Sequence, residues 1–294
     1  MEETIMESYL KAGKVIKKIR EELDSILKPG LLILDIAEFI ESRIKELGCM
    51  PAFPVNISIN DIVAHYTPTY NDKTKIRDGD LVKIDIGAHK NGYIADYAFT
   101  YCTKRNELVE TANNALNAGI SMLRPGIRVC DISKAIFEYV RSKKKGVVVN
   151  LTGHGLKRYD IHAEPSVPNI ENSSSYVIKE GDVIALEPFI ANTNSYVKDS
   201  TPVEIYSYLE TKPIRMKEAK SIMDFGKKLA GMPFAKRWLI NNGISPLKVE
   251  LALKQLEAIG AIRRYPTLRE SERRSVAQAE HTIIVRKKPI IITA

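Results

Sequence analysis

The sequence predicts an α+β fold in two similar halves, and two internal repeats support this prediction. The segment Ile76–Asp85 recurs as Ile178–Glu187 at an offset of 102 positions, and Leu27–Ile36 recurs as Leu123–Ile132 at an offset of 96 positions. Pro-Gly and Glu-Gly-Asp are common turn sequences, but two repeats in the same order favour duplication over chance. Each half is therefore expected to form a helix, a Pro-Gly turn, a second helix and strands that end in a carboxylate.

In the first half, hydrophobic spacing predicts two helices and then strands. A charged amphipathic stretch from about Glu3 to Leu27 predicts the first helix, and apolar residues at helix spacing between 36 and 47 predict the second. After a Gly-Asp turn, the apolar run Val82–Ile84 predicts a buried strand that ends at Asp85. The β-rich stretch 92–100 follows a Lys-Asn-Gly turn, which predicts a hairpin with this strand.

Acidic residues lie where the predicted strands end. Asp85 and Asp96 are expected at one end of the hairpin's sheet, and Glu187 stands at the matching place in the second half. An unpaired buried carboxylate costs several kcal/mol, roughly, so such groups are paired, protonated or bound to a cation. Two acids at matching positions in two similar halves therefore predict a shared cation.

The second half adds a histidine and a fourth acid. His154 stands between two glycines, which let the backbone approach a neighbour closely, although an isolated histidine of this kind is more often structural. Glu280 precedes the apolar run Ile283–Val285, which predicts a C-terminal strand. Four oxygen donors and one imidazole can hold two divalent ions, whereas one ion would not need so much negative charge. The five predicted ligands are Asp85, Asp96, His154, Glu187 and Glu280.

The composition is typical of a globular protein. Hydrophobic residues make up 44% of the 294 positions, which is enough for a sizeable core. No run approaches the roughly 18 apolar residues that a membrane-spanning helix needs, and the acidic start is unlike a secretory leader. We therefore expect a cytoplasmic protein with no membrane partner. Three widely spaced cysteines form neither a zinc-type pair nor a disulfide framework.

The net charge of +8 is compatible with transient contact with a polyanion such as ribosomal RNA. The basic clusters have no aromatic stacking platform beside them, and such clusters are more often solvated surface than binding sites. The sequence does not fix the oligomeric state, and we expect a monomer.

Six short motifs occur in order along most of the chain. They are Ala64–Pro68, Asp85–Ala88, Asp96–Thr100, Gly153–Leu156 with Ile161–His162, Glu187–Phe189 and Gln278–Thr282. This set resembles the type II methionine aminopeptidases, which are pita-bread metallopeptidases. The resemblance implies antiparallel sheet covered by helices, and a hydrolase that removes N-terminal methionine from nascent proteins through a water or hydroxide that bridges two metal ions. The ions are expected among Mn, Fe, Co and Zn.

The stretch between Glu187 and Glu280 is longer than a strand connection needs. Its helical patterns at 217–230, 234–241 and 246–259 resemble the winged-helix-like insert of type II members, in the short archaeal-type form. The predicted domains are a catalytic domain of residues 1–205 and 266–294, with halves of about 1–105 and 106–294, and an insert of residues 206–265. Winged helices suggest DNA binding by analogy, but fold does not fix function, and we expect no specific DNA binding.

The resemblance also implies roles for residues around the metals. Asp96 and Glu280 would bridge the two ions, and Glu187 would help to move the proton of the attacking water. Histidines would flank the substrate at two positions, His65 and His162, with His162 against the scissile carbonyl or the developing charge. The pocket for the methionine side chain would be lined by Phe53, Ile161, Phe189 and Tyr265. Such a pocket suits a flexible thioether, although apolar residues are usually core.

Two other classes of protein remain open. Prolidase and aminopeptidase P, which are Xaa-Pro-specific, share the catalytic fold, but the resemblance predicts an N-terminal domain in them, for which a first helix at about Glu3 leaves no room. A non-catalytic homologue that binds ribosomes or RNA would fit the charge of +8. Such homologues typically lose metal ligands, and this sequence keeps all five, so metal content after gentle purification separates the two classes.

Overall fold

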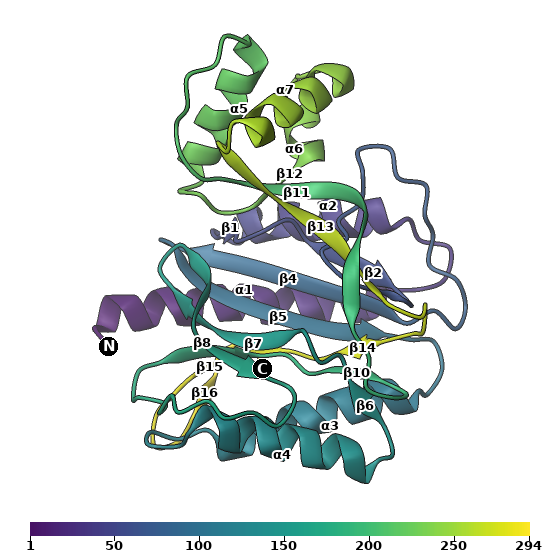
Figure 1. The fold of residues 1–294 in the computed structure, drawn as a ribbon, viewed down its shortest axis with the longest axis vertical. Helices are drawn as coiled ribbons and strands as arrows, with labels where there is room; N and C mark the ends of the chain where they lie inside the picture. Colours follow the sequence, from purple (N-terminus) through teal and green to yellow (C-terminus); the bar gives the residue numbers. More distant parts are fainter.

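The first half of the chain forms an antiparallel sheet with helices against it. The computed structural model describes all 294 residues. The elements of this half are α1 (Glu3–Ile26), α2 (Ile33–Glu46), β1 (Met50–Pro51), β2 (Asn56–Ile59), β3 (Ile62–Ala64), β4 (Val82–Lys90) and β5 (Tyr93–Tyr101). Strand β4 pairs with β1 and β2 along one edge and with β5 along the other. Helix α1 lies behind this hairpin (Figure 1), and its buried residues recur at helical spacing, as predicted.

The second half repeats the pattern of two helices followed by strands. Its elements are α3 (Glu107–Met122), α4 (Val129–Ser142), β6 (Gly146–Val147), β7 (Thr152–Lys157), β8 (Asp160–Pro168), β9 (Val183–Leu186), β10 (Phe189–Ala191), β11 (Val197–Tyr208), β14 (Ala277–Gln278), β15 (His281–Ile284) and β16 (Ile290–Ile291). Five strands form a sheet in the order β16-β15-β9-β7-β8. Helices α3 and α4 lie side by side beneath the strands in Figure 1 and share a second hydrophobic core with them.

Within each half, the Pro-Gly segment of one repeat is hydrogen-bonded to the start of the other repeated segment. The Gly30 amide donates a hydrogen bond to the Ile76 carbonyl, and the Gly126 amide donates one to the Ile178 carbonyl, both at 2.8 Å. Both glycines have a positive φ, 93° and 89°, which side chains disfavour. The matching turns and hydrogen bonds confirm the α+β fold in two related halves.

Between β11 and β14 the chain builds a smaller unit with its own hydrophobic core. Its elements are α5 (Lys217–Lys228), β12 (Phe234–Ala235), α6 (Lys236–Asn241), α7 (Pro246–Ala258) and β13 (Ile262–Glu270). In Figure 1 this unit stands above the sheets, and β11 and β13 run from it down into the body. Strands β11 and β13 pair antiparallel, and Ile205, directly before the predicted start of the insert, lies opposite Tyr265, its predicted end.

Two local expectations were wrong. The strand that was expected to end at Asp85 continues as β4 to Lys90, so Asp85 lies within the strand rather than at the end of a sheet. The hairpin turn explains the length, because Asn91 and Gly92 both have positive φ and form a tight two-residue loop beyond Lys90. The helix expected from Phe234 begins at Lys236, after the two residues of β12.

Candidate metal centre and substrate pocket

Two acids of the centre come from the β4–β5 hairpin. Asp85 lies opposite Ala98, and Asp96 lies opposite Gly87. Because side chains alternate between the faces of a sheet, both carboxylates lie on the same face, two positions apart. The Phe53 ring packs on this face, where a Cβ at Gly87 would lie 2.2 Å from it. The hairpin therefore presents both acids beside an aromatic wall.

His154 and Glu187 reach the same place from the second half. His154 lies on β7 opposite Ala185 of β9, and Glu187 directly follows β9. The glycines on either side of His154 allow close packing, as predicted, because a Cβ at Gly153 would lie 2.5 Å from the Ala185 carbonyl oxygen. His154 Nε2 is 3.3 Å from Glu187 Oε1 and 4.0 Å from Asp96 Oδ2. The histidine thus bridges the acids of the two halves.

Glu280 is held opposite Asp96 by two threonine hydroxyls. The Thr282 hydroxyl accepts a hydrogen bond from the Asp96 amide and donates one to the Asp96 carbonyl, both at 2.7 Å. The Thr100 hydroxyl makes the same pair of bonds with the Gln278 amide and carbonyl, both at 2.8 Å. Between them, the Glu280 amide donates to Ala98 at 2.8 Å. Two threonine hydroxyls thus take the place of backbone hydrogen bonds between β5 and the segment Gln278–Thr282. We call this arrangement the threonine clamp.

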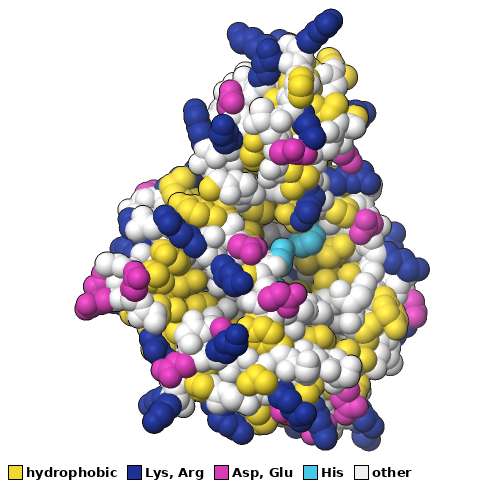
Figure 2. All heavy atoms as spheres, turned by 60° about the vertical axis from the view of Figure 1, so that its left-hand side comes forward, with side chains coloured by type: hydrophobic (Ala, Val, Ile, Leu, Met, Phe, Trp, Pro, Cys, Tyr) yellow, Lys and Arg dark blue, Asp and Glu magenta, His cyan; other side chains and the backbone are white.

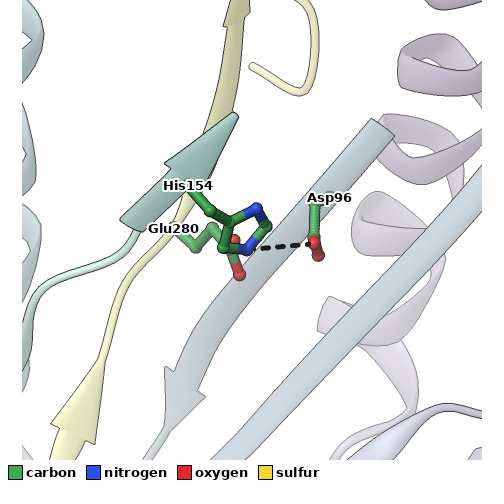
Figure 3. A group of neighbouring side chains, drawn as sticks. All are labelled: Asp96, His154 and Glu280. Carbon is green, nitrogen blue, oxygen red and sulfur yellow. Dashed lines mark ion pairs between the residues drawn. The ribbon is translucent and has the colours of Figure 1, made fainter. Parts of the chain in front are cut away.

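The centre has room for cations among oxygen and nitrogen donors. Ligand atoms of Asp96, His154 and Glu280 all lie within 4.8 Å of one another. Figure 3 shows the three side chains converging, with His154 directed toward Asp96. One carboxylate oxygen of Asp85 and one of Asp96 are buried without a hydrogen-bond partner. Buried oxygens without partners call for a proton or a cation.

The electrostatics of the acids also fit bound cations. Burial raises the pKa of Asp85 to about 8, with the charge of Glu187 adding to the shift, and burial raises the pKa of Glu187 to about 8. Burial and neighbouring acids raise the pKa of Asp96 and of Glu280 well above the ordinary value. Burial lowers the pKa of His154 to about 4, so the imidazole is neutral at pH 7, as a metal ligand must be. The donor set therefore fits divalent ions, which would compensate the crowded negative charge.

Two more histidines lie next to this centre. The rings of His154 and His162 meet edge to face, with their centroids 4.8 Å apart, and the ring of His65 meets that of Tyr265 edge to face at 5.9 Å. Burial and the nearby His162 lower the pKa of His65 to about 4. Partial desolvation of the His162 ring and the nearby His154 lower the pKa of His162 to about 4 as well, although part of the residue is exposed to solvent. Figure 2 shows histidine side chains in a hollow in the middle of one face of the molecule.

A small cavity of about 60 Å³ lies beside the hairpin. Its lining consists of Phe53, Asn56, His65, Asp85, Ile205, Pro233 and Tyr265. Three residues predicted to bind substrate thus gather there with one predicted metal ligand, Asp85. Ile161 and Phe189 are buried but do not line this cavity: Ile161 belongs to the same core as Phe53, and Phe189 to a separate small core. Their contact with substrate stays a prediction.

The threonine clamp was missed by sequence reasoning. Thr100 and Thr282 lie within the motifs Asp96–Thr100 and Gln278–Thr282, but the motifs predict no role for either hydroxyl. Alternation gives a usable signal for one of them, because Thr100 is four positions from Asp96 on β5 and the two side chains therefore share a face. The partner of each hydroxyl lies about 180 residues away, and only the fold reveals it.

These observations define the class of protein. A mixed α and antiparallel β fold in two halves, with four acids and a histidine at their junction, is that of a metallopeptidase, and the profile of Metallopeptidase family M24 matches residues 7–287. The chain belongs to this family. It is 46% identical to the methionine aminopeptidase of Thermococcus onnurineus over 98% of both chains. It is 42% identical to the methionine aminopeptidase of Archaeoglobus fulgidus over 100% of this chain and 99% of the other.

Solved structures share the fold at lower sequence identity. A methionine aminopeptidase from Rickettsia prowazekii matches with a TM-score of 0.72 and 23% identity, over 100% of this chain and 98% of the other. A thermophilic Arx1 matches with a TM-score of 0.84 and 17% identity, over 99% and 91%. A prolidase from Pyrococcus furiosus matches with a TM-score of 0.64 and 18% identity, over 100% of this chain but 64% of the other. These likenesses confirm the predicted pita-bread fold. None of the helices combines the length and apolar character needed to cross a membrane.

Proposed function

We infer that this chain is a methionyl aminopeptidase, a metallopeptidase that removes the N-terminal methionine from nascent proteins. The convergence of four acids and His154 beside the cavity that holds His65 is the observation that carries this inference. Relatives that are 40–46% identical over nearly their whole length are named methionine aminopeptidases. The prolidases, in contrast, are at 18% identity, which supports only the shared fold.

We propose that five residues hold two divalent ions. They are Asp85, Asp96, His154, Glu187 and Glu280, with Asp96 and Glu280 as bridges. Bound divalent ions would supply Lewis acidity and would lower the pKa of a water. Manganese, iron, cobalt and zinc all suit such a mixed oxygen and imidazole set, so availability decides among them.

The chain's own residues would position the substrate and move protons. Glu187 has one oxygen near His154 and another that receives only a long hydrogen bond, 3.5 Å, from Gln278. Bound cations would favour the ionised form of this carboxylate, and Glu187 would then accept a proton from the attacking water. With pKa values of about 4, His65 and His162 are neutral at pH 7, and a neutral imidazole can donate one hydrogen bond to a carbonyl oxygen. We assign this contact to His162.

The pocket would explain the choice of methionine. Phe53 and Tyr265 give the cavity beside Asp85 an aromatic surface, and Ile161 and Phe189, which are buried outside its lining, stay proposed contacts of the methionine side chain. A charged side chain entering such a surface would lose its hydration without gaining a partner. We expect cleavage after methionine when the second residue is small, and resistance of formylated or acetylated substrates, which lack a free terminal amine.

The 206–265 insert would form a separate unit with a distinct surface charge. Twelve Lys and Arg and five Asp and Glu fall in it, a net charge of +7 out of +8 for the whole chain. Such a concentration supports transient contact with a polyanion, and we propose the ribosome, where nascent chains emerge. We further propose a cytoplasmic monomer.

Four peptides test the proposed activity in a series of divalent metals. Met-Ala-Ser should be cleaved well, whereas Met-Lys-Ser, formyl-Met-Ala-Ser and Leu-Pro-Ser should be poor substrates. Preferential cleavage of Leu-Pro-Ser would instead assign the chain to Xaa-Pro peptidases. A metal-loaded protein that cleaves none of the four would favour the non-catalytic ribosome- or RNA-binding alternative.

A further inference from the structure

The insert is fixed to the body by a buried ion pair. Arg237 is in the first turn of α6, and only 1% of its surface is exposed, while Glu41 on α2 is 6% exposed. Arg237 Nη2 binds Glu41 Oε1, and Trp238 Nε1 donates to Glu41 Oε2 at 2.7 Å. Arginine and glutamate are rarely buried unless they are paired, so this contact is specific. It joins an insert helix to a helix of the first half.

The same pair holds two loops of the body by hydrogen bonds. Arg237 Nη1 donates to the Thr67 hydroxyl and to the Pro68 carbonyl, the latter at 3.2 Å. Glu41 Oε1 accepts from the Val55 amide at 3.1 Å, and the Thr67 hydroxyl donates to the Val55 carbonyl at 2.8 Å. The two loops are therefore tied to each other and to the insert through one buried network.

The tied residues are near neighbours of two cavity walls. Val55 is two residues after Phe53, and Thr67 is two residues after His65. His65 has a φ of 59°, in the left-handed region, and such a conformation persists only where the surroundings hold it. The insert also lines the same cavity directly, through Pro233 and Tyr265.

Stability alone does not explain this network. Burial raises the pKa of Glu41 despite the opposing charge of Arg237, so desolvation outweighs the attraction. Buried ion pairs can often be replaced by apolar groups without loss of stability. What an apolar contact could not supply is the set of directed hydrogen bonds to Val55, Thr67 and Pro68.

We propose that Arg237 and Glu41 are positioning residues that set the shape of the methionine pocket by fixing Phe53 and His65 through the Val55 and Thr67 loops. The proposal rests on the proposed function, in which this cavity receives the methionine side chain. It gives the insert a role in substrate selection, because its docking onto α2 and the shape of the pocket depend on the same hydrogen bonds. None of the network's hydrogen bonds ends on one of the five proposed metal ligands, so we expect metal binding to be largely independent of it.

The main test is the double variant Arg237→Met with Glu41→Gln, which removes both charges together and leaves an acceptor at position 41. We expect it to bind metals as the wild type does, while kcat/KM for Met-Ala-Ser falls by about 10²-fold, mostly through KM, since small misplacements can cost that much. We also expect its preference for Met-Ala-Ser over Leu-Ala-Ser to fall by about 10-fold or more, the range that one pocket contact provides. A merely structural role would not change this preference.

A second variant and a control make the test decisive. Thr67→Val keeps the ion pair but breaks the link to Val55, so it should show a smaller change in the same preference, and it decides the matter if the double variant does not fold. Lys248→Met removes an exposed ion pair with Glu218 inside the insert and should behave as wild type. Unchanged preference in both network variants would overturn the proposal, as would parallel loss of metals. Failure of the wild type to cleave Met-Ala-Ser would instead overturn the proposed function on which the proposal rests.

Discussion

Replacing Thr282 with valine should weaken the centre without removing any of the five proposed metal ligands. The Thr282 side chain is fully buried, and its hydroxyl serves both the amide and the carbonyl of Asp96. Valine has nearly the same shape but no hydroxyl. The amide N–H and the carbonyl of Asp96 would therefore both lose their hydrogen-bond partner, and no water would replace it. Asp96 would then no longer be fixed opposite Glu280.

The expected loss follows from these two groups. A buried donor or acceptor that is left unpaired costs about 1–3 kcal/mol, so two of them lower the free energy of unfolding of the metal-free protein by about 2–6 kcal/mol. Residues that orient metal ligands typically contribute about 10–100-fold to metal affinity, and we expect a loss of that size for manganese or cobalt.

Urea unfolding with a chelator measures the first quantity, and calorimetric metal titration measures the second. Thr111→Val is the matched control: Thr111 is also buried, but its hydroxyl only donates to the Glu107 carbonyl within α3. That carbonyl belongs to a helix and keeps its backbone partner, so the control should lose less than about 1 kcal/mol. Equal effects of the two variants, or unchanged metal affinity in Thr282→Val, would refute the clamp.

Two further predictions concern the ligands. Asp96→Ala or Glu280→Ala should reduce kcat by more than about 10²-fold, because losing a ligand costs more than losing a group that orients it; near-normal turnover at saturating metal would disprove the dimetal assignment. Asp85 and Glu187, with pKa values raised to about 8, keep protons that the unfolded chain releases near pH 4, so stability without metal should fall as the pH rises toward 8. His65 and His154, with pKa values near 4, have the opposite effect: they make stability rise with pH below about pH 6.5. The fall in stability should therefore be seen between pH 6.5 and 8, where each acid lowers the free energy of unfolding by up to about 1.4 kcal/mol per pH unit. Melting temperatures with chelator that rise across this window would contradict the assignment.

The repeats explain why a candidate site could be proposed from the sequence. Asp85 and Glu187 stand at matching places in two repeats, and duplicated halves that pack together bring matching places close. A carboxylate within an apolar strand is also a strong signal, because burying it alone is too costly to be accidental. The proposed ligand positions therefore follow from local patterns and one symmetry argument.

Other features depend on contacts between distant parts of the chain. Arg237 and Glu41 are 196 residues apart, and nothing in the sequence around either residue indicates burial or a partner. The position of Asp85 was misjudged for a related reason: the length of β4 is set by the tight turn after Lys90 and by pairing with β5, rather than by the apolar run that precedes Asp85. Local patterns indicate that a strand exists more reliably than where it ends.

The proposed centre and the pocket differ in which parts of the chain build them, and this difference bears on how the fold supports several specificities. The five donors come only from the two halves, and the threonine clamp holds Asp96 and the segment of Glu280 within them. The cavity wall, in contrast, takes Pro233 and Tyr265 from the region of the insert, and its loops are tied to Arg237. A change in the insert during evolution could therefore alter which substrate side chain the pocket accepts, while the charged centre kept its geometry. This separation is consistent with a fold that this chain shares with a prolidase at only 18% identity, because selection by a pocket needs only a few contacts beside an unaltered metal centre.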